Sequence, residues 1–337
     1  MDEQTKSWRI VAVRRLSEAQ LEALSEVAEV DYFEDVDESN RADFMAALSR
    51  AHGLIGGMLE LNEAMLAEAP ALQVVSTISV GYDHLPLKAL NQRRILLCNT
   101  PDVLTETTAD TAFMLVMATQ RRLVELSNLV RDGGWRTHIG HEYFGIDVHG
   151  KTLGIVGAGR IGAAIARRGA LGFGMPILYT AASSKPALEQ QLGAKRRELN
   201  DLLAEADIVC LSVPYNSDTH HLIDADALAR MKTTAALINI ARGKVVDEPA
   251  LIEALHSGGI RAAGLDVFVE EPLPPDSPLA AMDNVVTTPH IGSATHETRE
   301  AMAQLAVDNL LGTLIGSGPL TAVNEHVWRR ADAIEET

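Results

Sequence analysis

The stretch Leu153-Gly154-Ile155-Val156-Gly157-Ala158-Gly159-Arg160-Ile161-Gly162 decides the fold. Its first four residues are typical of a buried strand, and its last six match G-x-G-x-x-G just before an expected helix over residues 163–171. In that motif the first glycine permits a tight turn, the second lets the backbone approach a pyrophosphate, and the third allows close helix–sheet packing. The N–H groups at the helix N-terminus then hold the anion. A plain glycine-rich turn would explain the six residues alone, but the strand and helix around them favour a dinucleotide site made by Gly157, Gly159, Arg160, Ile161 and Gly162.

Short β-branched runs alternate with helical stretches on both sides of this motif. Runs typical of buried strands begin at Ile177, Ile208, Ala236, Gly264 and Val285 after the motif, and at Ile10, Leu54, Val74 and Ile95 before it. Strands that alternate with helices predict parallel sheets covered by helices on both faces.

A continuous helical pattern over residues 107–130 separates the two sets of strands, and a last helix is expected over about residues 297–314. A chain of 337 residues is long enough for two domains. We therefore predict an α/β protein with two doubly wound parallel-sheet domains. A discontinuous, flavodoxin-like substrate domain would comprise residues 1–103 and 293–337, and a Rossmann dinucleotide-binding domain residues 104–292.

The composition limits the kinds of partner and the cellular compartment that can be expected. The chain has 29 Lys+Arg against 46 Asp+Glu, a net charge of −17, which disfavours nucleic acid and anionic membrane surfaces. Its two cysteines, Cys98 and Cys210, lie in apolar runs and are expected to be reduced thiols rather than a disulfide. With a polar start and no apolar run long enough to cross a bilayer, a cytoplasmic protein is expected.

The loop after the second strand of the dinucleotide domain bears on the choice of cofactor. A site selective for NAD usually places Asp or Glu there, whereas residues 179–185 read Tyr-Thr-Ala-Ala-Ser-Ser-Lys. Thr180, Ser183 and Ser184 can donate hydrogen bonds beside Ala182, and Lys185 supplies positive charge. We predict that NADP(H) is preferred and that NAD(H) is possible, the alternative being a polar surface loop that accepts both.

Three polar residues follow the ends of three predicted parallel strands: Arg242, Glu271 and His290. Ligands bind outside the carboxyl ends of such strands, so these side chains are expected at one rim. A histidine can donate a proton near neutral pH, a carboxylate can orient it, and a guanidinium can grip a carboxylate through two bonds. The set therefore predicts reduction of a small 2-oxo acid. Taken singly, each residue has an ordinary structural explanation: a capping histidine, a solvated charge or an ion-pair partner.

The sequence lacks the motifs that are typical of metal sites and of serine hydrolases. The sequence has no His-Glu-x-x-His and no Cys-x-x-Cys, so no metal site is expected. It also has no G-x-S-x-G, the nucleophile turn of serine hydrolases.

Several motifs carry a resemblance to a known family. They are Ser76-Thr77-Ile78-Ser79-Val80-Gly81-Tyr82-Asp83 and the segments 157–162, 239–246, 264–272 and 288–292. Over nearly its whole length the chain resembles the D-isomer-specific 2-hydroxyacid dehydrogenases. Segments 78–83, 175–179 and 290–299 make it most similar to the branch of glyoxylate/hydroxypyruvate reductases and 2-ketogluconate reductases.

The resemblance implies roles for particular residues. His290 would be the acid/base with Glu271 as its partner, Arg242 would bind the substrate carboxylate and carbonyl, and the N–H groups of Val80 and Gly81 would complete the carboxylate site from the other domain. The further cofactor contacts that it implies are Val213, Pro214, Thr219, Ile240, Ala241, Arg242, Asp266, His290 and Gly292, with Asp266 accepting a hydrogen bond from the carboxamide.

The resemblance also implies a homodimer joined through the cofactor domains, with an exchanged arm over residues 132–145. NADPH-preferring members of the branch often carry arginines where Ala182 and Ser183 stand, which weakens the case for strict NADP(H) dependence. We predict NAD(P)H-dependent reduction of glyoxylate, hydroxypyruvate or 2-ketogluconate to D-2-hydroxy acids. The alternatives are another D-2-hydroxyacid specificity or a dinucleotide-sensing, corepressor-like binding protein.

Overall fold

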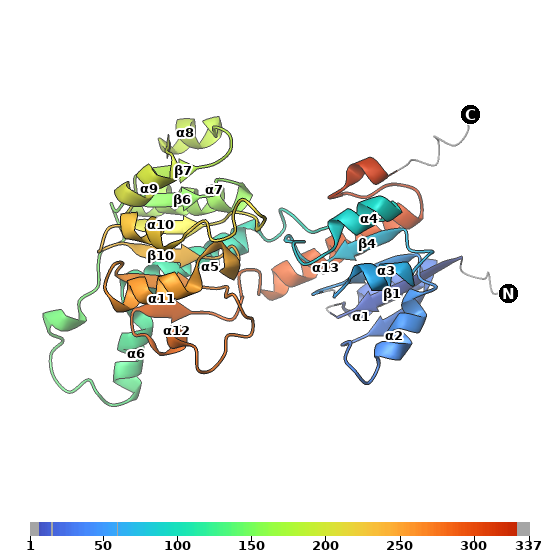
Figure 1. The fold of residues 1–337 in the computed structure, drawn as a ribbon, viewed down its shortest axis with the longest axis horizontal. Coiled ribbons are helices and arrows are strands. Elements are labelled where there is room, and N and C mark those ends of the chain that lie inside the picture. The colour runs from blue at the N-terminus through green and yellow to red at the C-terminus, as the bar shows by residue number, and fades with distance from the viewer. Residues whose placement is uncertain (1–6, 15, 59, 329–337) are drawn as a thin grey trace. The chain divides into compact units, whose positions relative to one another are not determined.

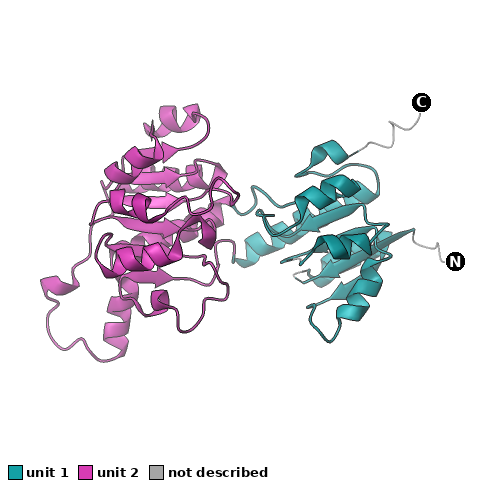
Figure 2. Ribbon diagram, viewed as in Figure 1, with its two compact units in different colours: residues 1–104, 294–337 teal, residues 105–293 magenta. Residues whose placement is uncertain are grey.

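The computed structural model describes residues 7–14, 16–58 and 60–328. The chain divides into two compact units, unit 1 with residues 1–104 and 294–337, and unit 2 with residues 105–293 (Figure 2). The domain boundaries predicted from the sequence differ from this division by one residue at each crossing. The role of unit 1 as a substrate domain stays a prediction.

Unit 1 is built on a five-stranded parallel sheet with the strand order β2-β1-β3-β4-β5 (Figure 1). Its strands are β1 (Trp8–Val13), β2 (Ala28–Phe33), β3 (Gly53–Gly56), β4 (Val74–Thr77) and β5 (Leu96–Cys98). Its helices are α1 (Glu18–Val27), α2 (Arg41–Leu48), α3 (Glu63–Ala67), α4 (Leu87–Arg93) and α13 (His296–Leu314), followed by the 3₁₀ turn η4 (Glu325–Val327). This is the flavodoxin-like strand order.

The C-terminal return of the chain belongs to the core of unit 1. Helix α13 packs against β3 and β4, and the Ser76 hydroxyl donates to the Ala306 carbonyl at 2.8 Å. Farther on, the Asn324 side chain accepts from the Leu97 N–H at 2.7 Å. Segments more than 200 residues apart in sequence therefore share one hydrogen-bonded core.

Unit 2 contains a seven-stranded parallel sheet with the order β12-β11-β10-β9-β6-β7-β8. Its strands are β6 (Leu153–Val156), β7 (Ile177–Thr180), β8 (Lys195–Arg196), β9 (Ile208–Leu211), β10 (Ala236–Asn239), β11 (Ala262–Leu265) and β12 (Val285–Thr287). Its helices are α5 (Thr105–Gln120), α6 (Leu123–Arg131), α7 (Arg160–Arg167), α8 (Pro186–Leu192), α9 (Leu199–Glu205), α10 (Ala225–Arg230), α11 (Glu248–His256) and α12 (Pro278–Ala281). Shorter turns are η1 (His141–Tyr143), η2 (Arg168–Gly172) and η3 (Gly243–Val245).

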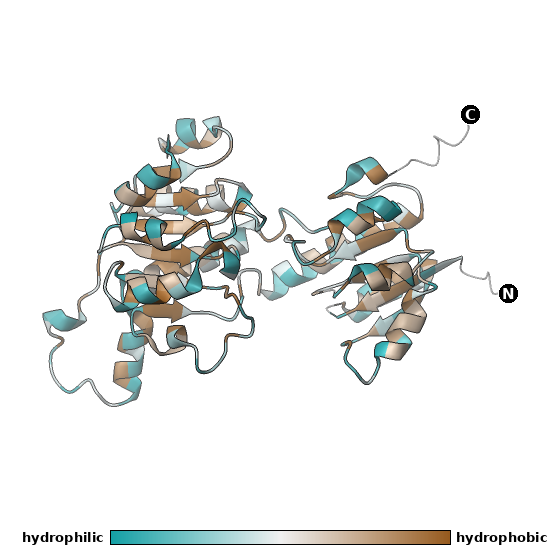
Figure 3. Ribbon diagram, viewed as in Figure 1, coloured by the Kyte–Doolittle hydropathy of each residue, from teal (hydrophilic) through white to brown (hydrophobic). Residues whose placement is uncertain are grey.

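The inner strands of both sheets are mostly apolar, as expected for sheets covered on both faces, whereas the edge strands β2 and β8 carry charged residues (Figure 3). In unit 2 every residue of β6, β9, β10 and β11 is buried. The prediction of two parallel-sheet α/β domains is confirmed.

The single helix predicted over residues 107–130 is wrong. The chain forms α5 and α6 with a break at Arg122, which is left-handed with φ 53°. The Arg122 guanidinium stabilises the break by donating to the Glu125 carboxylate at 2.5 and 2.7 Å and to the Glu142 carbonyl at 2.5 Å. Helix α6 has no buried residue and extends from the rest of unit 2 (Figure 1).

No helix in the described ranges combines the length and apolar character that crossing a membrane requires.

Candidate active site

The turn between β6 and α7 has the geometry that a dinucleotide needs. Gly157 has φ +97°, and a Cβ there would lie 2.8 Å from the backbone of Ser212 and Val213. At Gly162 a Cβ would lie 2.3 Å from the Gly157 carbonyl oxygen. At Gly159, the N-cap of α7, a Cβ would meet nothing within 4 Å. Gly157 and Gly162 thus allow close packing, and Gly159 leaves its backbone open. The turn therefore fits a bound pyrophosphate at the helix N-terminus.

The three predicted catalytic residues follow neighbouring strands of unit 2. Arg242 follows β10 and caps η3, Glu271 follows β11, and His290 follows β12. The His290 Nδ1 lies 2.7 Å from the Glu271 Oε2, and these side chains are 47% and 35% exposed. The other Glu271 oxygen accepts from the Phe268 N–H at 3.0 Å. The imidazole is therefore oriented by a carboxylate that is itself anchored to the backbone.

The electrostatics of Glu271 link all three residues. Burial acts to raise the pKa of Glu271, but the hydrogen bonds from His290 and the Phe268 N–H, with the charges of His290 and Arg242, outweigh it. The pKa is thus held below the ordinary 4.5, and the carboxylate is ionised at neutral pH. The charge of Arg242 also acts on Glu271, so the guanidinium is near enough to the carboxylate to favour its ionised form.

Asp266 fixes the turn that carries His290. It is 1% exposed, and its carboxylate accepts from the Thr288 hydroxyl at 2.6 Å and from the Ile291 and Gly292 N–H groups at 2.8 Å each. His290 itself has φ 54°, a left-handed conformation that non-glycine residues adopt at a cost. Three hydrogen bonds around this residue offset that cost. Sequence reasoning assigned Asp266 to the cofactor and missed this role.

The loops of Arg242 and Glu271 touch at Gly243. A Cβ at Gly243 would lie 1.9 Å from the Phe268 carbonyl carbon, 2.0 Å from its oxygen and 2.3 Å from the Val269 nitrogen. All three atoms are backbone, so no side chain can move aside. Only glycine fits between these two loops. One loop carries Arg242 and the other carries Glu271, so the close approach at Gly243 fixes the spacing of the two loops of the candidate site.

The remaining predicted cofactor contacts of unit 2 lie in the loops after β9 and β10. Val213 faces the glycine turn, since its Cγ1 would be 2.7 Å from a Cβ at Gly157. The Thr219 hydroxyl donates to the Pro214 carbonyl at 2.7 Å and closes the loop after β9. Ile240 and Ala241 are buried, at 8% and 6% exposed.

The loop that follows β7, residues 181–185, is called the selectivity loop from here on. Its surroundings differ from those expected from the sequence. Ala182, Ser183 and Ser184 are exposed, as a contact loop requires. However, the Glu189 carboxylate of α8 lies beside the loop and accepts from the Tyr179 hydroxyl at 2.5 Å and the Ser184 hydroxyl at 3.0 Å. Residues 179–185 contain no carboxylate, but Glu189, ten positions from Tyr179 in sequence, brings one to the loop by tertiary contact.

Val80 and Gly81 belong to unit 1, in the loop after β4. The Asn99 side chain donates to the Val80 carbonyl at 2.9 Å and the Ser79 hydroxyl donates to the Gly81 carbonyl at 2.7 Å. These bonds use the carbonyl oxygens of the loop, so the shape of the loop is fixed without its N–H groups.

In the described ranges, no group of three or more His, Cys, Asp and Glu side chains could hold a metal ion.

Comparisons with known proteins place this site in a family. The family described as "D-isomer specific 2-hydroxyacid dehydrogenase, NAD binding domain" matches residues 113–292. The chain is 51% identical over 302 residues to glyoxylate/hydroxypyruvate reductase B of Yersinia enterocolitica, covering 90% of this chain and 93% of that protein. The chain belongs to the D-isomer specific 2-hydroxyacid dehydrogenase family.

Solved structures that are 42% and 34% identical to this chain share its fold. The TT0316 protein of Thermus thermophilus matches with a TM-score of 0.86 and 42% identity, over 94% of this chain and 99% of that one. The NADPH-dependent glyoxylate/hydroxypyruvate reductase of Sinorhizobium meliloti, solved with NADP and malonate, matches with a TM-score of 0.82 and 34% identity over 96% and 98%. The resemblance drawn from the sequence motifs is therefore confirmed, and unit 2 is the NAD-binding domain of a dehydrogenase.

Proposed function

We propose that this dehydrogenase is a reductase of small 2-oxo acids that prefers NADP(H) and acts on glyoxylate or hydroxypyruvate. The observation that carries the proposal is the 2.7 Å contact between His290 and Glu271, beside Arg242, at the strand ends of a dinucleotide-binding unit. A relative that is 51% identical to this chain is named glyoxylate/hydroxypyruvate reductase B, and a solved relative was crystallised in complex with NADP.

His290, Glu271 and Arg242 have distinct roles in the proposed reaction. A dinucleotide held through its pyrophosphate at the glycine turn would supply the hydride from its reduced nicotinamide. The carbonyl oxygen of the substrate becomes an alkoxide and takes a proton from the Nε2 of His290. Glu271 holds Nδ1 and stabilises the imidazolium before transfer. Arg242 grips the substrate carboxylate and polarises the carbonyl through its fork of N–H donors.

The charge of the substrate explains why Arg242 matters. A chain of net charge −17 repels small anions, so a 2-oxo acid needs a local cation. We propose that the N–H groups of Val80 and Gly81 in unit 1 can bind a carboxylate. Their carbonyl oxygens are engaged by Asn99 and Ser79, which holds the loop in one conformation.

Substrate specificity and the proton donor can be tested together. Glyoxylate, hydroxypyruvate and 2-ketogluconate are each assayed with NADPH and NADH, using wild type and His290→Ala. Loss of a general acid lowers kcat by about 10²–10⁴-fold for every substrate that is turned over. A matched control is His256→Ala, since His256 is an exposed histidine at the end of α11 in the same unit. Full activity of His290→Ala, or no turnover by wild type of any 2-oxo acid, would overturn the proposal.

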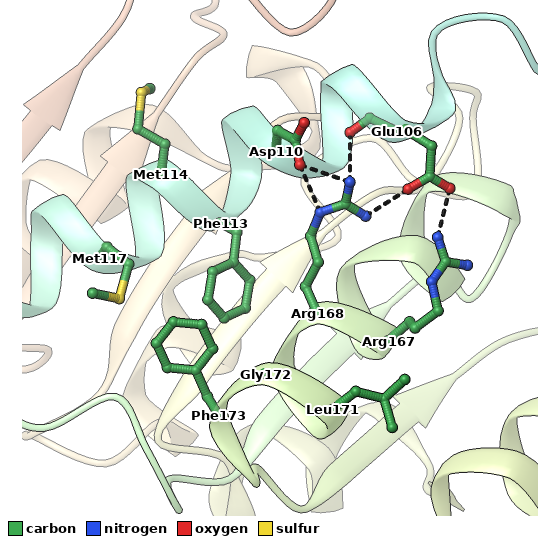
Figure 4. A pocket seen from close by; sticks show the side chains of 10 residues that line it. All are labelled: Glu106, Asp110, Phe113, Met114, Met117, Arg167, Arg168, Leu171, Gly172 and Phe173. Atoms are coloured by element: carbon green, nitrogen blue, oxygen red, sulfur yellow. Dashed lines mark hydrogen bonds and ion pairs between the residues drawn. The ribbon is translucent and has the colours of Figure 1, made fainter.

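We further propose a homodimer formed through unit 2. A cavity of about 640 Å³ on this unit is lined by Phe113, Met114, Met117, Leu171 and Phe173. In Figure 4 the rings of Phe113 and Phe173 lie beside each other, with centroids 4.7 Å apart, and Leu171 on the same side is 71% exposed. Such apolar exposure favours a protein partner, and a second copy fits because the arm over residues 132–145 also exposes apolar side chains, Trp135 at 60% and Phe144 at 64%.

Charged residues border this apolar cavity. Arg168 lies between Asp110 and Glu106, at 2.6 and 2.9 Å, and Arg167 contacts Glu106 at 2.6 Å (Figure 4). An apolar centre with a polar rim is typical of protein interfaces. Light scattering should give the dimer mass for wild type and the monomer mass for Leu171→Glu. A monomeric wild type would exclude the dimer.

A cytoplasmic location is also proposed. Cys98 and Cys210 are unpaired, and burial raises the pKa of each thiol to about 12, so both stay protonated. Buried thiols of this kind suit a reducing compartment. Recovery of the protein with a periplasmic or membrane marker on fractionation would contradict this location.

A further inference from the structure

A basic side chain reaches the selectivity loop from a neighbouring strand. Arg196 lies on β8, the edge strand of the seven-stranded sheet, directly opposite Tyr179 of β7. Its Nη2 donates to the Ala181 carbonyl at 3.1 Å. The guanidinium therefore lies at the first residue after β7, although Arg196 is fifteen positions away in sequence.

The position is the one where the ribose 2′ substituent of a dinucleotide is recognised. In Rossmann domains the residues that follow the second strand contact the 2′-hydroxyl through a carboxylate or the 2′-phosphate through an arginine. Here β7 is that second strand, because it is the next strand in the chain after β6 and the helix α7, and it pairs with β6. The loop itself contains no arginine.

Arg196 has donors available for such a contact. The side chain is exposed, and a guanidinium carries five N–H donors, of which the Ala181 carbonyl accepts from one. Within residues 7–14, 16–58 and 60–328, Arg196 forms no ion pair within 4.0 Å. Its neighbour on the strand differs, because the Arg197 guanidinium is paired with Glu205 at 2.9 Å.

Glu189 is the opposing charge. Hydrogen bonds from Tyr179 and Ser184 hold the pKa of Glu189 below its ordinary 4.5, and the nearby charge of Arg196 lowers it further. Both hydroxyls bond the same oxygen, Oε1, which directs that oxygen toward the protein. With Lys185 and Arg196 as cations and Glu189 as the anion, the charges around the loop sum to +1, which favours a phosphate over a hydroxyl.

We propose that Arg196 binds the 2′-phosphate of NADP in place of a loop arginine, and that Glu189 limits the strength of this preference. The inference rests on the cofactor use proposed above and adds the residue that determines it. A guanidinium anchored by a carbonyl on one side can still offer two parallel N–H groups to a phosphate on the other.

The test measures binding of cofactor fragments, without turnover. Isothermal titration with 2′,5′-ADP and 5′-AMP reports the contribution of the 2′-phosphate alone. Arg196→Gln should weaken 2′,5′-ADP by roughly tenfold or more, the effect of losing a charge-assisted hydrogen bond. Binding of 5′-AMP should stay within about twofold, since only the phosphate contact is removed. Arg197→Gln is the matched control and should leave both fragments unchanged, because Arg197 is already paired with Glu205.

Two further variants complete the test. Glu189→Gln should tighten 2′,5′-ADP a few-fold by removing the opposing charge. Ala182→Arg in the Arg196→Gln background should restore selectivity by returning an arginine to the loop. The inference is wrong if Arg196→Gln leaves the ratio of the two affinities unchanged, weakens both fragments equally, or if wild type does not distinguish them. A positive result without reduction of any 2-oxo acid would leave Arg196 as the phosphate ligand while the proposed reaction failed.

Discussion

Replacing Gly243 with alanine tests the contact between the two loops that carry Arg242 and Glu271. The new Cβ would lie 1.9 Å from the Phe268 carbonyl carbon, whereas ordinary contact begins at 3.4 Å, so the loops must separate by about 3.4 − 1.9 = 1.5 Å. Overpacking costs 1–3 kcal/mol, and a backbone neighbour that cannot change rotamer puts the cost near the upper end, about 3 kcal/mol. In a unit of 189 residues (293 − 105 + 1) this lowers Tm by roughly 6–12 °C.

The turnover rate should fall as well. The displaced loop contains Phe268, whose N–H anchors Glu271, and a misplacement of about 1 Å can cost up to about 100-fold in rate. Thermal unfolding and 2-oxo acid turnover at a temperature where the variant is folded measure the two effects. Gly259→Ala is the control, because its Cβ would meet its nearest neighbour at 3.4 Å. If Gly243→Ala melted within about 2 °C of wild type and kept its turnover, the close approach of these loops would be refuted.

Three further outcomes follow from the same geometry. Arg242→Lys should raise KM for the 2-oxo acid about tenfold and change cofactor affinity much less, because an ammonium cannot form the two parallel bonds to the carboxylate; steady-state kinetics and cofactor titration measure this. Asp266→Asn places an amide N–H₂ against the Gly292 or Ile291 N–H and should lower the free energy of unfolding by about 1–3 kcal/mol in urea titrations; an unchanged midpoint would contradict the role given to this carboxylate. Because the pKa of Glu271 is lower in the folded than in the unfolded chain, its contribution to stability is present above about pH 4.5 and is lost as the pH falls through the folded value. The Tm measured between about pH 6 and pH 3, roughly 1.5 units either side of the ordinary pKa of 4.5, should therefore fall more steeply for wild type than for Glu271→Gln.

Local sequence pattern was sufficient for most of the fold. Buried strands such as β6 and β9 are continuous apolar runs, and the glycine motif sets where β6 ends and α7 begins. The edge strand β2 was missed because its sequence, Ala-Glu-Val-Asp-Tyr-Phe, carries two acidic residues and is only partly buried. The break between α5 and α6 was missed because helical periodicity continues across it. What ends α5 is the contact of Arg122 with a carbonyl twenty residues farther on.

The same limit applies to the candidate site. That Arg242, Glu271 and His290 lie in loops after three neighbouring strands could be predicted, because the pattern identifies those strands and parallel strands end at one rim; their catalytic roles stay a prediction. Glu189 and Arg196 could not, since each reaches the selectivity loop from a different element. Side chains that arrive by tertiary contact leave no local pattern in the sequence.

The C-terminal return of the chain into unit 1 has a consequence for how the protein is made. A ribosome releases all of residues 105–293 before it releases α13, so unit 2 can fold while unit 1 is still incomplete. Until α13 emerges, β3 and β4 lack the helix that covers them, and the Ser76 hydroxyl lacks its acceptor at Ala306. In nascent chains stopped before α13, unit 2 should therefore resist proteases, whereas residues 1–104 should still be cut.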